Sequence, residues 1–356
     1  MDHREIIFYL PGVPAPIGGF KVVYEHAQIL REAGFSTAVV HVNPAIYEKV
    51  GFSLFFRKIY FLYRRFFDRW RNYPLQYGLE INYLNAYPND EGADAIVIAS
   101  WQIMNSFLQK NIFNVNKIIH LAQDYPGYMG PEDKIKTSWK LGKKYLGVSQ
   151  HLVKSIQQEV TTLNPRTVEY IPAFSRNKRD TSSKSIVVDR LFCVVSSGKY
   201  KNQRNLIKLL NKLVSQIEVI TFSREERPKH LSKSIKHLES PTDSVIEDMY
   251  RTSRYSLSYS EFEGFCLPAF EAMYHNCILL TTDCLGNQDY IDADKNCVLL
   301  NGRNVDQDFE KVVRVMEKSE KEKLNIQHNA GIATLKYLET YNHDYTVKKY
   351  LQMIEG

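Results

Sequence analysis

Two glutamates in the last third of the chain bracket a loop that is suited to binding an anion. Glu263 and Glu271 lie on either side of Gly-Phe-Cys-Leu-Pro at 264–268. Pro268 fits the first turn of a helix, because its missing N–H would have no partner there, and Gly264 allows backbone conformations that a side chain would hinder. The free N–H groups and positive dipole end of such a helix favour a phosphate. Glu271 could then accept hydrogen bonds from ligand hydroxyls, or simply complement the dipole, while Glu263 would face whatever lies beyond the phosphate.

Two basic residues could bind a phosphate. Lys199 and Arg204 follow the strand-like run LFCVVSS. The negative charge of a bound phosphate requires a metal ion or fixed cations and backbone donors. The alternative is that they are solvated charges beside Lys201 and Lys208. The Asp-Ala-Asp at 292–294 is typical of a solvated turn, so we expect no metal site.

A second group of candidates lies in the first half of the chain. Gly18 and Gly19 follow the first strand-like run, and Gln123 and Asp124 end the run KIIHLAQD. Ligands of open parallel sheets bind at the carboxyl ends of the strands, so these residues could line a second substrate's site. Gly18 and Gly19 could also be only a loop. His120 lies within its strand and is expected to be a core residue.

Composition limits the classes of protein that the chain can form. It has 356 residues, 44% of them hydrophobic, and a net charge of +6, which favours two globular domains and an anionic ligand or surface. The first residues do not resemble a signal peptide, and no apolar run is long enough to span a bilayer. The five cysteines lack CxxC spacing, so we expect reduced thiols and a cytoplasmic location.

Apolar strand-like runs alternate with segments of helical period throughout the chain. This pattern predicts an α/β fold in which helices cover both faces of doubly wound parallel sheets. The alternation stops at 174–190, where the sequence is rich in serine, lysine, arginine and aspartate, and we interpret this stretch as a linker. The predicted domains are therefore 1–173 and 191–340.

The motifs resemble those of a known family. Glu-Gly-Phe-Cys-Leu-Pro at 263–268, followed by Glu-Ala-Met at 271–273, an apolar strand and Gly286, is similar to the signature of retaining GT-B glycosyltransferases, in particular glycosyltransferase family 4. The pair Lys199 and Arg204 resembles the family's diphosphate-binding pair with the two basic types exchanged. Gly18-Gly19 resembles its acceptor-side loop. The chain departs from the family pattern at three places, with Cys266 for a glycine, Ala173-Phe174 for Asn-Gly, and Gln123 where histidine is frequent.

The resemblance implies a fold, a reaction and a set of site residues. The fold is GT-B, two Rossmann-like domains facing each other across a cleft, with a final helix at 341–356 crossing back onto the first domain. The reaction is transfer of a hexosyl-type sugar from a nucleoside diphosphate sugar to a saccharide or lipid-linked acceptor. It requires neither a metal nor a cofactor. The implied context is synthesis of a cell-surface polysaccharide or glycolipid. The resemblance implies catalytic roles for Glu263, Asp124 and Gln123, acceptor contact for Gly18 and Gly19, and donor binding by Lys199, Arg204, Gly264, Phe265, Cys266, Leu267 and Glu271.

The sequence leaves one alternative function open and disfavours another. A non-catalytic GT-B subunit that binds a sugar nucleotide or a partner glycosyltransferase is the alternative, and product formation distinguishes it from an enzyme. A nicotinamide dehydrogenase is disfavoured, because neither domain opens with a GxGxxG turn.

The segment 53–73 is not explained by the family core. Its aromatic and aliphatic residues interleave with basic residues, which are Arg57, Lys58, Arg64, Arg65, Arg69 and Arg71. This composition is typical of a helix that lies in a membrane surface, here expected to be the inner face of the membrane, but a helix packed on the first domain or an acceptor-binding arm would also fit. No RNA-binding motif accompanies it, so we expect no nucleic acid partner.

Overall fold

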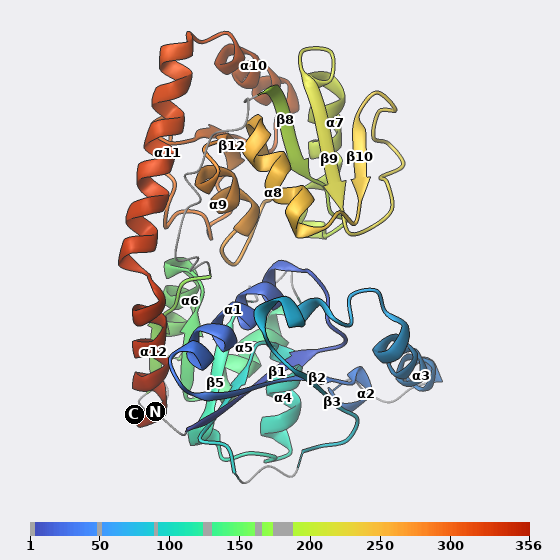
Figure 1. Cartoon of the computed structure of the whole chain (residues 1–356), viewed down its shortest axis with the longest axis vertical. Coiled ribbons are helices and arrows are strands. Elements are labelled where there is room, and N and C mark those ends of the chain that lie inside the picture. The colour runs from blue at the N-terminus through green and yellow to red at the C-terminus, as the bar shows by residue number, and fades with distance from the viewer. Residues whose placement is uncertain (1–3, 48–51, 89–91, 124–129, 161–165, 174–187) are drawn as a thin grey trace. The chain divides into compact units, whose positions relative to one another are not determined.

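The computed structural model divides the chain into two units. The first comprises Met1–Ser175 and Tyr341–Gly356, and the second comprises Arg176–Thr340 (Figure 1). The structure describes residues 4–47, 52–88, 92–123, 130–160, 166–173 and 188–356, with the backbone alone at 52–55, 57, 58, 60 and 199. Most of the predicted linker, 174–187, lies outside the described residues. Residues 188–190 already belong to a strand, so regular structure resumes earlier than the sequence predicted.

A seven-stranded parallel sheet forms the centre of the first unit. Its strands have the order β3-β2-β1-β4-β5-β6-β7. In chain order they are β1 (Glu5–Pro11), β2 (Ser36–Val42), β3 (Ile81–Leu84), β4 (Ala95–Ile98), β5 (Ile118–Ala122), β6 (Lys144–Gly147) and β7 (Thr167–Tyr170). Strands β4 and β5 are buried along their whole length, as expected for a sheet that helices cover on both faces.

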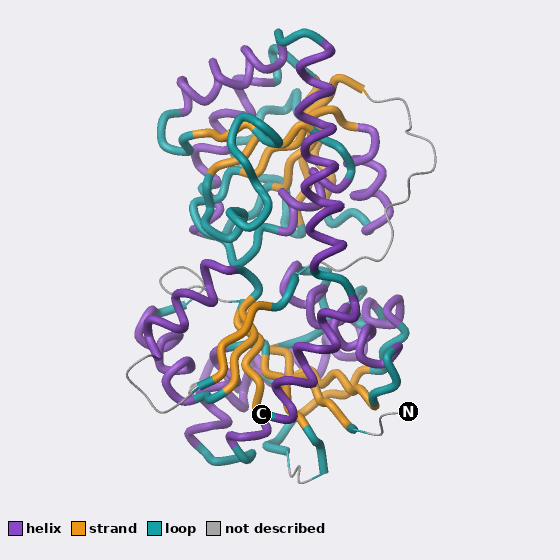
Figure 2. Tube along the Cα trace, turned by 90° about the vertical axis from the view of Figure 1, so that its left-hand side faces the viewer, coloured by secondary structure: helices purple, strands orange, loops and turns teal. Residues whose placement is uncertain are grey.

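Helices flank this sheet on both sides (Figure 2). They are α1 (Gly18–Glu32), α2 (Pro44–Tyr47), α3 (Phe52–Phe67), α4 (Trp101–Gln109), α5 (Glu132–Leu141), α6 (Gln150–Val160), α12 (His343–Glu355) and the short 3-10 helices η1 (Tyr73–Tyr77) and η2 (Val115–Lys117). In the part of the chain that the structure describes, no helix is long and apolar enough to cross a membrane.

The C-terminal helix α12 packs against the first unit. Tyr350 is fully buried, its ring lies edge-on to Phe8 at 5.9 Å between centroids, and its hydroxyl lies 3.1 Å from Nδ1 of His26. The Tyr345 hydroxyl donates a hydrogen bond to the carbonyl oxygen of Tyr170 at 3.3 Å. These contacts cross most of the length of the chain, so the last helix completes the core of the unit in which the chain begins.

The second unit repeats the architecture with six parallel strands. The order is β10-β9-β8-β11-β12-β13, with β8 (Val188–Val194), β9 (Glu218–Ser223), β10 (Lys236–Glu239), β11 (Ser253–Ser258), β12 (Ile278–Thr282) and β13 (Val298–Leu300). The helices are η3 (Lys199–Lys201), α7 (Gln203–Leu213), α8 (Asp243–Thr252), α9 (Leu267–Tyr274), α10 (Val305–Met316) and α11 (Glu320–Thr340). Two doubly wound parallel sheets confirm the predicted fold class.

The strand order reverses at one place in each sheet. In the first unit this is between β1 and β4, and in the second between β8 and β11. The loops that follow such a strand pair diverge to opposite faces of the sheet and leave a crevice at its carboxyl edge. Ligands of open α/β sheets bind there, so these loops are where a functional site is expected.

Candidate functional site

The loops after β8 and β11 meet at the switch point of the second sheet. The backbone N–H of Glu261 donates a hydrogen bond to the carbonyl oxygen of Tyr200 at 2.8 Å, which joins the two loops directly. The first loop carries Lys199–Lys201 as the 3-10 helix η3. The second carries Glu263 and leads into α9, where Pro268 occupies the first turn as the sequence predicted.

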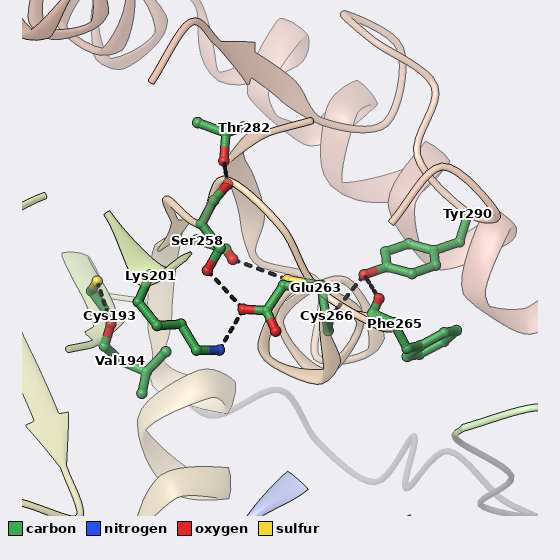
Figure 3. Close-up of polar contacts among 10 residues, drawn as sticks. Cys193, Val194, Lys201, Ser258, Glu263, Phe265, Cys266, Thr282 and Tyr290 are labelled. Carbon is green, nitrogen blue, oxygen red and sulfur yellow. Dashed lines mark hydrogen bonds and ion pairs between the residues drawn. The ribbon is translucent and has the colours of Figure 1, made fainter. Parts of the chain in front are cut away.

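Glu263 and Lys201 form an ion pair across these loops (Figure 3). Only 12% of the Glu263 side chain and 21% of the Lys201 side chain are exposed. The Ser260 hydroxyl donates a second hydrogen bond to the same carboxylate oxygen, at 2.7 Å. Burial alone lowers the pKa of Lys201, but the Glu263 carboxylate outweighs it, and the pKa is raised above its ordinary value. The site therefore holds a charged ammonium beside a carboxylate.

The backbone of the Glu263 loop is fixed by close packing on the segment after β12. The N–H of Glu263 donates to the carbonyl oxygen of Cys284 at 2.9 Å. Gly286 lies so near that a Cβ built on it would be 2.5 Å from the carbonyl oxygen of Glu263. A side chain at position 286 would therefore push Glu263 out of place, which explains the glycine there.

Cys266 is the residue that caps α9. Its φ of 67° and ψ of 60° lie in the left-handed region, where glycine is the favoured residue. The structure thus gives a reason for glycine at this position in the resembling family, and the chain adopts the same conformation with a cysteine. A hydrogen bond with Cys284 lowers the pKa of the Cys266 thiol below its ordinary value, whereas burial raises that of Cys284.

A tyrosine supports the loop from behind. The hydroxyl of Tyr290 lies 3.0 Å from the carbonyl oxygen of Phe265 and 2.9 Å from that of Cys266 (Figure 3). Phe265 is buried and its ring packs on Tyr290 and Tyr337, with centroids 5.2 and 5.7 Å away. Phe265 therefore anchors the backbone of the loop that leads into α9, whereas Gly264 and Leu267 are partly exposed.

The other predicted donor-binding residues take different positions. Glu271 lies half-buried in α9, where its charge adds to the effect of burial in raising the pKa of Tyr250. Arg204 is exposed in the first turn of α7. Lys199 begins η3, and its side chain lies outside what the structure describes. Among the described side chains, Lys201 contacts Glu263, whereas from the sequence it is only a charge neighbouring Lys199.

Two of the candidates of the first unit, Gly19 and Gln123, meet at the end of β5. The amide of Gln123 donates a hydrogen bond to the carbonyl oxygen of Gly19 at 3.1 Å, and a Cβ at Gly19 would lie 3.1 Å from the Gln123 amide oxygen. Gly18 is the first residue of α1. Asp124 lies outside the described residues. His120 is buried in β5, as predicted, and burial lowers its pKa to about 4.

Comparison with solved structures identifies the class of fold. Over 99% of its length the chain resembles HepE from Anabaena, solved with UDP-glucose (TM-score 0.71, 13% identity, 100% of that chain). It also resembles sucrose-phosphate synthase from Thermosynechococcus elongatus (TM-score 0.68, 11% identity, 98% of that chain) and TarM (TM-score 0.71, 10% identity, 99% of both chains). The fold is therefore GT-B.

The second unit carries the family match. Residues 176–331 match the family model described as Glycosyl transferases group 1, so this unit is similar to that family of glycosyltransferases. No curated protein sequence matches the chain. The matched range contains Lys201, Glu263 and Glu271, and it places the ion pair within the part of the chain that the family shares.

Proposed function

We propose that the protein is a retaining glycosyltransferase that moves a sugar from a nucleoside diphosphate sugar to a saccharide or lipid-linked acceptor. The observation that carries the proposal is the Lys201–Glu263 ion pair at the switch point of the second sheet, beside the start of α9. A diphosphate between Lys201 and the free N–H groups of α9 would find both a fixed cation and a positive dipole end.

Each residue of the donor site has a proposed role. Glu263 contacts the donor sugar, because it lies in the loop beyond the helix start, and Glu271 accepts hydrogen bonds from the ribose. Lys199, Lys201 and Arg204 stabilise the leaving diphosphate, and the backbone from Gly264 to Leu267 surrounds it. The leaving phosphate oxygen then takes the proton of the acceptor hydroxyl on the same face of the sugar, so the anomeric configuration is retained.

The proposed acceptor side is the Gln123–Gly19 contact. Gly18 and Gly19 allow a substrate to approach the backbone closely, and Gln123, with Asp124 after it, orients the acceptor hydroxyl rather than removing its proton. HepE and a variant of S. aureus TarM were solved with UDP or a UDP sugar, which supports a nucleotide-linked donor. Synthesis of a cell-surface polysaccharide or glycolipid is the proposed context. All five cysteines are free and buried, which supports a cytoplasmic location.

The alternative is a non-catalytic GT-B subunit that binds a sugar nucleotide or a partner enzyme. Its supporting observation is that the Glu263 carboxylate is paired with Lys201 and Ser260 of the protein itself. A subunit of this kind would bind the nucleotide and form no product, whereas an enzyme would release the nucleoside diphosphate as it transfers the sugar.

A thermal-shift screen with UDP-, GDP-, dTDP- and ADP-sugars tests the proposal. A donor present at roughly 100 times its dissociation constant should stabilise the protein by about 2.7 kcal/mol. Glu271→Ala and Arg204→Ala should reduce the shift without changing the unliganded melting temperature. A flat response to every donor would contradict donor binding, and a shift without product would favour the non-catalytic alternative.

A further inference from the structure

Helix α3 is held against the first unit by one side. Phe61 is 3% exposed, and its ring lies edge-on to that of Tyr83 in β3 at 6.1 Å between centroids. The guanidinium of Arg65 lies 4.9 Å from the centre of the same ring. Figure 1 places α3 at the edge of the unit beside α2. Phe61 and Arg65 thus anchor the helix on the first unit. Their contacts fix the rotation of the helix about its axis, and therefore which side chains point away from the unit.

The opposite side of α3 is apolar and exposed. We call this the outer face, and its residues with their exposed fractions are Phe56 (57%), Ile59 (49%), Leu62 (36%), Tyr63 (58%), Phe66 (55%) and Phe67 (70%). At about 100° per residue, all six lie roughly 100° or more from Phe61 around the helix axis. Tyr63 and Phe67 stack at 4.8 Å, so the face is continuous along the helix. A soluble surface rarely leaves so many large apolar side chains together.

The segment around the outer face is strongly basic. Residues 52–79 contain six arginines and lysines and one acidic residue, Asp68, and Asp68 is paired with Arg64. Arg69 and Arg71 are exposed just beyond the end of the helix. Arg71 also donates to the carbonyl oxygen of Phe66, which keeps its charge next to the outer face. An apolar face bordered by cations complements a surface that is apolar inside and anionic outside.

We propose that α3 lies in the surface of an anionic lipid bilayer, with its outer face inserted below the headgroups and Arg69 and Arg71 beside lipid phosphates. The aromatic rings match the apolar and polar layers of that interface, and the arginines match its charge. This inference goes beyond the proposed transfer reaction and does not depend on it. If both proposals hold, membrane binding by α3 would place the enzyme where a lipid-linked acceptor is found.

Vesicle flotation tests the proposal. The full chain is mixed with vesicles of phosphatidylcholine alone or with about one third phosphatidylglycerol, at low and at about 0.5 M salt. We expect flotation with the anionic vesicles, weakened by salt. Phe66→Ser with Phe67→Ser should weaken binding by roughly 10-fold or more for each phenylalanine, because each loses the burial of a large apolar side chain. Arg69→Gln with Arg71→Gln should reduce the preference for anionic lipid.

A matched control replaces exposed apolar residues of the second unit. Leu324 and Ile332 on α11 are 53% and 50% exposed, so Leu324→Ser with Ile332→Ser changes surface apolarity equally and should leave vesicle binding unchanged. Circular dichroism melting of each variant checks its folding. Equal binding by wild type and the Phe66/Phe67 variant, or no binding by wild type, would overturn the proposal. A lipid-free dimer that this variant dissociates would also overturn it, because a second copy would then cover the outer face.

Discussion

Lys201 and Glu263 come from loops after two different strands, β8 and β11, and form an ion pair that is largely removed from solvent. Breaking a pair of this kind leaves one buried charge without its partner, which is costly. The proposed diphosphate sugar would supply new partners for both, phosphate oxygens for the ammonium and sugar hydroxyls for the carboxylate. The pair therefore holds the two loops together, and the proposed donor would replace it without leaving either charge alone.

Lys201→Met should lower kcat/KM for the donor by about 100-fold, because a fixed cation at the leaving diphosphate contributes most in the transition state. Lys208→Met on the exposed side of α7 is the matched control and should leave the rate unchanged. Initial rates at varied donor concentration separate the effects on kcat and KM. Equal rates for the two variants would exclude Lys201 from the site.

Transfer should survive EDTA. In the proposed site, Lys201, its basic neighbours and the N–H groups of α9 balance the diphosphate charge, and these groups are not removed by a chelator. Within the described residues, no group of three or more acidic, histidine or cysteine side chains is arranged to hold a metal ion. Rates measured with EDTA and after adding magnesium or manganese test this expectation. Complete loss that either metal restores would show that the diphosphate requires a divalent ion.

The effect of a Cys266 substitution on stability should depend on the backbone conformation at this position more than on the size of the new side chain. Because φ is 67°, Cys266→Val places a branched side chain in the left-handed region and should destabilise the protein by about 2 kcal/mol or more. Cys266→Gly removes that strain and loses buried thiol contacts, so its stability should stay within about 1 kcal/mol of wild type. Urea unfolding measures the stability of both variants, and nucleotide titration measures their ligand binding. Similar losses for the two variants would show that the thiol, not the backbone, is what matters.

Tyr350→Ala should destabilise the first unit by about 3–5 kcal/mol, the usual cost of truncating a buried aromatic residue. It removes the ring that packs on Phe8 and the hydroxyl next to His26. Gln352→Ala, two residues further along α12 and exposed, is the control and should be neutral. Urea unfolding followed by circular dichroism gives the comparison. A neutral Tyr350→Ala would mean that α12 adds little to the unit.

The sequence predicted those features that depend on local signals. The alternation of strands and helices indicated two doubly wound sheets, and Pro268 marked the start of α9. It did not predict Lys201 as the partner of Glu263. The choice among nearby cations depends on the 3-10 turn at Lys199–Lys201 and on Asn202, whose φ of 49° turns the chain sharply into α7. The periodicity of apolar residues along the sequence carries no information about such a turn.

The outer face of α3 is a second feature that local sequence signals could not predict. The residues 53–73 were recognisable as apolar and basic, but the sequence left open whether the aromatic side chains pack inward. That is decided by contacts between Phe61, Arg65 and Tyr83 in a strand distant in sequence, which no local pattern specifies.

Stability should fall as the pH is lowered from about 6.5 to about 4, because three histidines of the first unit are buried in the neutral form. Burial lowers the pKa of His120 to about 4 and that of His41 to about 3, and it lowers that of His26 to about 4 against the opposing hydrogen bond to Pro172. In the unfolded chain these groups titrate near the ordinary value of about 6.5. Between the two pKa values the unfolded chain binds protons that the native protein does not, so acid favours unfolding in this window.

His120 allows the clearest test, since its Nδ1 is buried with no hydrogen-bond partner among the described residues. His120→Leu removes the titrating group, so its free energy of unfolding should fall less between pH 7 and pH 5 than that of wild type. The expected difference is about 2 kcal/mol, since each unit of pKa shift corresponds to about 1.4 kcal/mol. Urea unfolding at both pH values gives the four free energies required. An identical pH dependence in the two proteins would mean that His120 is protonated, or reached by water, in the folded state.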